Sequence, residues 1–143
     1  MFTSIDLKAH LLHDGGGQVF IEAKLLGKKI RLLIDTGASH TIFDKRRLRR
    51  KFPEIEFTED RRISSGFQAQ IANSPEVLVK GLSIGKLGVS EFKAGTIDLS
   101  YVNKTYKDLG IKPIDGILGF EILARYRAMI DLTTYMLHLE LPQ

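Results

Sequence analysis

The segment Leu32 to Ser39 is the part of the sequence whose residue types could perform chemistry. It reads Leu-Leu-Ile-Asp-Thr-Gly-Ala-Ser, so the carboxylate of Asp35 stands at the exit of an apolar run. Gly37 allows a sharp turn and a close approach of its amide to that carboxylate. A short acid in a rigid, partly desolvated turn is suited to act as a general base. The tripeptide Asp-Thr-Gly is also common in ordinary capped turns, so the surrounding sequence must decide between these readings.

The elements that would position Asp35 are short strands. Period-two alternation of apolar residues recurs between turn signals, which is typical of a mostly β protein. A strand at 19–25 turns back at Gly27 into a strand at 30–34, which is apolar on both faces at its end and so should be buried on both sides. A second short apolar strand, 117–118, ends at Gly119 and echoes the first.

The rest of the chain predicts further short elements. We expect a strand at 2–7, a charged surface helix at 44–52 that ends before Pro53, a hairpin at 63–71, strands at 77–79 and 82–85, a short helix at 121–126 and a closing hairpin from 129–131 and 135–141. Residues 100–109 fit either one or two helical turns or a long polar loop.

Two motifs together resemble those of the retropepsin-like aspartic proteases, the retroviral-type, half-size relatives of pepsin. They are the Asp35 segment and, about eighty residues later, Asp115-Gly116-Ile117-Leu118-Gly119. The resemblance runs from about residue 18 to residue 141. It implies an all-β, acid-protease-like closed barrel with a psi-loop core, a flap hairpin and one or two short helices. We expect residues 1–143 to form one such domain.

The resemblance also implies roles for single residues. Asp35 would be the catalytic acid, and Thr36 would hydrogen-bond across a dimer interface. The implied cleft floor is Gly37, Ala38 and Ser39, the psi-loop is Ile117, Leu118 and Gly119, and the flap tip is Ser65, Gly66 and Phe67. Two features depart from the family pattern: Phe120 and Glu121 follow Gly119 where Asp, Asn or Arg is usual, and residues 98–113 are longer than the minimal retroviral segment.

The number of acids predicts the oligomeric state. Hydrolysis by this route needs two carboxylates ~3 Å apart that share one proton. The segments at Asp98, Asp115 and Asp131 all lack the Thr-Gly turn, so one chain supplies one acid. We therefore expect a homodimer with the site on its two-fold axis, where the two acids titrate as a pair. A polypeptide substrate, preferably apolar, would bind extended like an added strand.

Ala38 bears on the working pH. A serine at this position could hydrogen-bond the carboxylate and favour its ionised form, whereas alanine cannot. We therefore expect activity in mild rather than strong acid.

Other function classes fit less well. A non-catalytic dimerisation or peptide-binding module on the same fold remains the main alternative. Six of the seven residues 45–51 are basic and could bind nucleic acid. Without these six, however, the chain has 15 basic and 17 acidic residues, so its basic character is local. This favours a solvated helix face over a nucleic-acid interface. A haloacid-dehalogenase phosphatase needs a second Asp at position 37, an actin-type ATPase needs two large lobes, and no P-loop motif is present.

The composition limits which cofactors the protein could bind and where in the cell we expect it. The chain has 143 residues with 43% apolar content and no cysteine, so disulfides, thiolate metal sites and thiol nucleophiles are excluded. Its four histidines lack a set of partner ligands, so we expect no metal and no cofactor. No apolar run approaches the ~18 residues of a membrane span. Asp6, Lys8 and His10 interrupt the stretch where a secretion signal would lie, so we expect a cytoplasmic protein.

Overall fold

The computed structural model describes residues 1–58 and 74–143. The expected hairpin at 63–71 and the flap residues Ser65, Gly66 and Phe67 lie outside the described residues. The strands are β1 Phe2–Asp6, β2 Lys8–Leu11, β3 Gly17–Leu25, β4 Lys28–Ile34, β5 Ile42–Asp44, β6 Phe57–Thr58, β7 Glu76–Val79, β8 Leu82–Ile84, β9 Leu87–Gly88, β10 Phe92–Ile97, β11 Gly116–Leu118, β12 Met129–Asp131 and β13 Met136–Glu140. The helices are α1 Lys45–Lys51, α3 Ser100–Asp108 and α4 Phe120–Arg125.

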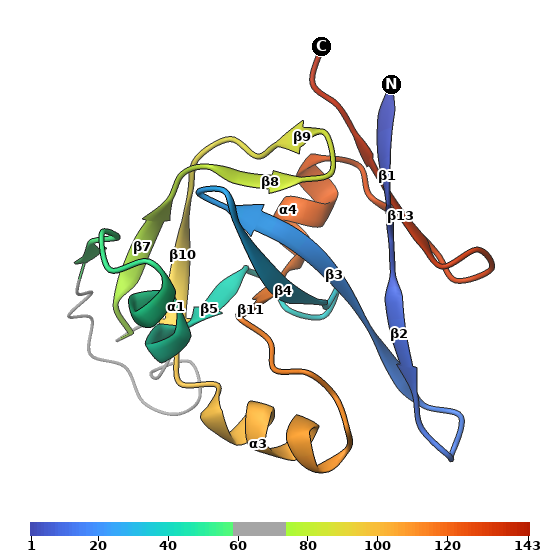
Figure 1. The fold of residues 1–143 in the computed structure, drawn as a ribbon. Coiled ribbons are helices and arrows are strands. Elements are labelled where there is room, and N and C mark those ends of the chain that lie inside the picture. Colours follow the sequence, from blue (N-terminus) through green and yellow to red (C-terminus); the bar gives the residue numbers. More distant parts are fainter. Residues whose placement is uncertain (59–73) are drawn as a thin grey trace.

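A small three-stranded sheet gathers the two ends of the chain. Its order is β1-β13-β12, and β1 runs antiparallel to β13 with Phe2 opposite Glu140. The β12–β13 pair is the closing hairpin that the sequence predicts. In Figure 1 this sheet lies along one side of the molecule, with both termini close together at the top.

The larger sheet carries the psi arrangement. Its strand order is β6-β7-β10-β5-β11-β4-β3-β8-β9, and β2 adds to β3. β11 lies between β4 and β5: it is parallel to β4, with Ile117 opposite Leu33, and antiparallel to β5, with Ile117 opposite Ile42. The mostly β class with short helices and the psi-loop core are thus confirmed. No strand pair in the described part joins β6 to β9, so closure into a barrel stays a prediction.

Both faces of β4 are buried, as its apolar run predicts. Leu32 and Ile34 belong to the main core, which also contains Leu118 and Ile122. Leu33 points to the opposite face, into a second cluster with Phe20 and Tyr106. The second cluster is covered by α3, which lies below the sheet in Figure 1. Tyr106 is the one buried residue of α3, so packing of this ring decides for a helix over a polar loop.

The helix α1 forms at the predicted place but is not simply a solvated face. Asp44 caps it by accepting the amide hydrogen of Arg47 at 3.1 Å. Leu48 is buried, while Arg47 and Lys51 turn inward to the buried carboxylate of Asp115. The expected solvated face is therefore formed by Arg46, Arg49 and Arg50, whereas Arg47 and Lys51 depart from it. Within the described residues, no helix is long and apolar enough to cross a membrane.

We expect Leu118→Ala to lower the free energy of unfolding by about 2–5 kcal/mol, because it leaves a cavity in a fully buried site. The matched control is Leu78→Ala, a strand residue that is 43% exposed and should cost less than about 1 kcal/mol. Urea unfolding followed by circular dichroism measures both. Equal losses in the two variants would contradict this account of the core.

Candidate active site

The carboxylate of Asp35 projects from the end of a strand that is held on both sides. The amide of Asp35 donates to the carbonyl oxygen of Leu118 at 3.1 Å, so pairing with β11 extends one residue past β4. The side chain is half-buried, and Oδ1 accepts the amide hydrogen of Gly37 at 2.8 Å. The amide of Ala38 also donates to the Asp35 carbonyl oxygen at 3.2 Å. A tight turn thus fixes this carboxylate in a partly desolvated position.

The residues after Asp35 form a projecting loop. Thr36, Gly37 and Ser39 are exposed, and Ala38 is half-buried. The hydroxyl of Ser39 lies 3.1 Å from Nδ1 of His40. The exposed side of the loop is therefore available to a substrate or to another chain.

A carboxylate from α4 fastens this loop to the core. Glu121 accepts the amide hydrogen of Thr41 at 2.6 and 2.9 Å and the Thr41 hydroxyl at 2.5 Å. The same hydroxyl oxygen accepts the amide hydrogen of Gly119 at 2.9 Å, and the amide of Phe120 donates to the carbonyl oxygen of Ala38 at 2.7 Å. Glu121, one of the two residues after Gly119 that depart from the usual family pattern, therefore holds the far end of the loop that carries Asp35.

Gly119 is required by the closeness of this junction. A Cβ atom at this position would lie 2.6 Å from the carbonyl carbon of His40 and 2.8 Å from its oxygen. The backbones of the loop and of β11 could not approach in this way with any side chain present. The structure thus brings Ile117, Leu118 and Gly119 directly beside the Asp35 segment.

Tyr106 is a neighbour of Asp35 that the sequence did not point to. Its ring meets Phe20 edge-on, with centroids 5.8 Å apart at 90°. Burial raises the pKa of Tyr106, a hydrogen bond with the side chain of Gln18 opposes this, and the charge of Asp35 raises it further. The phenol therefore stays protonated at any pH at which an acid protease works. The one sequence signal for a role of Tyr106 near Asp35 is an aromatic residue within a mostly polar segment.

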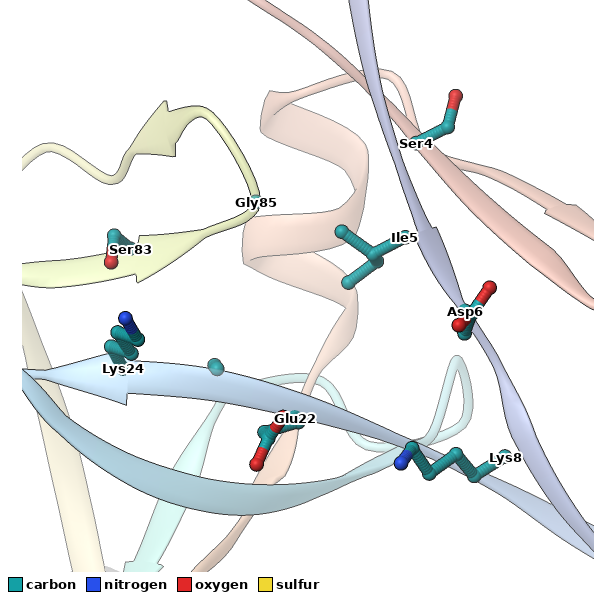
Figure 2. Close-up of a pocket in the computed structure, with 9 residues that line it drawn as sticks. Ser4, Ile5, Asp6, Lys8, Glu22, Lys24, Ser83 and Gly85 are labelled. Carbon is teal, nitrogen blue, oxygen red and sulfur yellow. The ribbon is translucent and has the colours of Figure 1, made fainter.

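A cavity of about 520 Å³ opens beside Asp35. Asp35 is the only carboxylate among the described residues that line it, together with Thr36 and residues of the β2–β3 and β12–β13 hairpins. Two of these, Leu11 and Leu132, are apolar yet 68% and 59% exposed. A larger cavity of about 580 Å³ lies between β1, β3 and β8 and is lined by charged and small polar residues (Figure 2). It contains no residue of either motif, so we place the site at Asp35.

The three other aspartates considered as a possible second acid have other interactions. Asp115 is buried and ion-paired with Arg47 and Lys51. Asp98 is exposed and Asp131 is half-buried, and hydrogen bonds from the side chains of Ser100 and Thr134, respectively, lower their pKa values. Each therefore serves a turn or an ion pair, and the described part of the site holds one carboxylate. The described residues contain no cluster of three or more His, Asp or Glu side chains placed to hold a metal ion.

Comparisons with known proteins agree with this geometry. A profile of the aspartyl protease family matches residues 21–122, well over half of the chain. A search of curated protein sequences gave no significant match. Among solved structures, the fold is similar to a retropepsin-like aspartic protease from Rickettsia conorii, with 19% identity, a TM-score of 0.55 and coverage of 97% of this chain and 89% of that one. It is also similar to the retroviral protease-like domain of Ddi1 from Leishmania major, with 16% identity, a TM-score of 0.54 and coverage of 88% and 94%.

A strand-borne aspartate, a tight Thr-Gly turn and an inserted third strand define a retropepsin-like fold. The chain belongs to the aspartyl protease family.

We expect Glu121→Ala to lower the free energy of unfolding by about 1–3 kcal/mol, because the amide and hydroxyl of Thr41 lose their acceptor. Hydrogen exchange should show the loss of protection concentrated at Thr41 and Gly119. Glu121→Gln keeps one acceptor oxygen, so it should retain part of the protection at Thr41 and Gly119. Unchanged protection at Thr41 in the alanine variant would refute the role given to Glu121.

Proposed function

We propose that this protein is an aspartic endopeptidase that acts as a homodimer, with Asp35 of each chain forming the catalytic pair. The observation that carries the proposal is the half-buried Asp35 carboxylate, fixed by the Gly37 amide at the end of β4 and open to a cavity. Family membership supports the reaction class. The polypeptide substrate would lie over Gly37, Ala38 and Ser39, with residues 65–67 as the flap.

The chemistry follows from two such acids held together. One ionised carboxylate removes a proton from a water molecule while the oxygen of that water attacks the peptide carbonyl carbon. The protonated partner acid donates its hydrogen bond, and then its proton, to the carbonyl oxygen. As the tetrahedral intermediate collapses, the C–N bond breaks and the amine leaves with the proton taken from water. At the same time a hydroxyl of the intermediate returns its proton to the partner acid as the carbonyl group re-forms. The paired acids share one proton again at the end.

Exposed apolar side chains support association of two chains. Leu11, Leu132 and Tyr135 are exposed around the cavity that holds Asp35 and Thr36. An exposed apolar patch of this kind, made of residues that line the same cavity as an incomplete site, is typical of an interface. A two-fold axis through this region would bring the Thr36 hydroxyls and the Asp35 carboxylates of the two subunits together.

We expect the purified protein to cleave a complex peptide library between about pH 4 and 8, with its maximum in mild acid, and Asp35→Asn to abolish cleavage, because the amide can neither accept nor deliver the proton. New termini are read by mass spectrometry. Asp108→Asn, a change at an exposed carboxylate on α3, is the matched control and should cleave as the native chain does. Cleavage that persists in Asp35→Asn would refute the assignment.

We also expect the rate of cleavage to rise with the square of protein concentration when the protein is dilute, because each site needs two chains. Sedimentation velocity over the same concentrations should show the monomer converting to dimer. Leu132→Asp, which places a charge in the exposed apolar patch, should move both curves to higher concentration together. A folded dimer that cleaves nothing would favour a peptide-binding module on this fold.

A further inference from the structure

A third cavity, which shares no lining residue with the cavity beside Asp35, has the character of an anion site. It lies between β4, α1 and the segment before β11 and has a volume of about 300 Å³. Its ionic lining consists of Lys8, Lys29, Arg31, Arg47, Lys51 and Lys112 with Glu22 and Asp115. Six cations face two carboxylates, a local excess of four positive charges. The pocket shares only Lys8 and Glu22 with the 580 Å³ cavity and no lining residue with the cavity beside Asp35, and it contains none of the residues 35–39.

The carboxylate of Asp115 organises one wall of this pocket. It accepts hydrogen bonds from the Arg31 amide (2.8 Å), from Nε of Arg47 (2.8 Å) and from Nζ of Lys51 (2.9–3.0 Å). The negative charge of Asp115 is therefore compensated within the protein by Arg47 and Lys51. It places two cationic side chains at fixed positions without leaving a free acceptor to repel a ligand.

The side chain of Arg31 has an unsatisfied hydrogen-bond donor. Its Nε atom is buried and has no hydrogen-bond partner among the described residues. Its guanidinium stacks 4.2 Å from the centroid of the Phe20 ring. Burial lowers the pKa of Arg31, and only the ionised form of Tyr106 would oppose this. A partly desolvated guanidinium with an unused donor is costly unless an anion completes it.

The other cations of the pocket are also available. Lys8 and Lys112 make no ion pair in the described part of the chain, and Lys29 reaches Glu22 only at 3.8 Å, with both groups largely exposed. Lys8 and Glu22 stand at the border with the neighbouring cavity and are labelled in Figure 2. Free cations from β2, β4 and the segment after α3 therefore converge on one concave site.

We propose that this pocket binds a phosphate group. A phosphate monoester carries about two negative charges and three strong acceptor oxygens, which suits a guanidinium fork and several lysines better than a single carboxylate would. The site is a small concavity rather than an extended basic stripe, so it fits one phosphate and its carrier rather than a nucleic-acid backbone. The carrier is a free phosphate compound or a phosphorylated side chain of another protein.

The test uses the full-length native chain and three probes at low salt. These are sodium phosphate, sodium pyrophosphate and the peptide acetyl-Ala-Ala-phosphoserine-Ala-Ala-amide, with the unphosphorylated peptide as blank. Binding is followed by NMR through the Nε–H signal of Arg31 and the backbone amides of Arg31 and Asp115. Arg31→Met keeps the packing on Phe20 and removes the charge. Arg50→Met removes an equivalent charge from the exposed face of α1 and is the matched control.

We expect saturable shifts at Arg31 with the phosphate probes, an affinity at least tenfold lower in Arg31→Met, and less than a twofold change in Arg50→Met. Pyrophosphate binding more tightly than the phosphopeptide would identify a free phosphate compound as the ligand class, and the reverse order a phosphorylated protein. Absent saturation, or equal losses in the two variants, would overturn the proposal and leave only non-specific attraction to a basic surface. Because no readout involves cleavage, the outcome is separate from that of the proposed peptidase activity.

Discussion

The insertion of β11 between β4 and β5 is the constraint on which the rest of the structure depends. A strand of three residues makes backbone pairs on both edges, and glycines at its ends permit the close contact. A Cβ atom at Gly116 would lie 2.6 Å from the carbonyl oxygen of Ile42, and one at Gly119 would meet the backbone of His40. The loop that carries Asp35 joins the two outer strands, so it must pass over β11 and be anchored by it. The position of the Asp35 carboxylate is therefore set by backbone hydrogen bonds.

This arrangement combines a rigid acid with an open loop. Asp35 is tied to Leu118, and Thr41 is tied to Gly119 and Glu121, so both ends of the loop are fixed by residues about 80 positions away in sequence. Between these anchors, Thr36 and Gly37 remain exposed. The two anchors therefore hold the Asp35 carboxylate in place while the loop between them stays open to solvent, which is the combination that the proposed general base needs.

The sequence predicted those elements that are determined by residues close together in the chain. The doubly apolar run before Asp35, the glycine stop at Gly119, the charged helix at α1 and the closing hairpin all depend on neighbours in sequence. The strands β5 and β10 were missed because they show little apolar alternation: the buried face of β10 consists of Ala94 and Thr96, and the Thr96 hydroxyl is satisfied by the Pro75 carbonyl oxygen at 2.6 Å. Glu121 and Tyr106 were missed as site neighbours because only the tertiary fold brings them to the loop.

The terminal strands have a consequence for how subunits would meet. β13 is hydrogen-bonded on both edges, by β1 and by β12 of its own chain, and the amide of Leu141 donates to the Met1 carbonyl oxygen at 2.8 Å. A chain therefore completes its small sheet without borrowing a strand. Association of two copies in the proposed dimer would then be an encounter of preformed surfaces, with a rate set by diffusion and orientation. Subunits of such a pair would exchange at the rate of dissociation, without either chain having to unfold first.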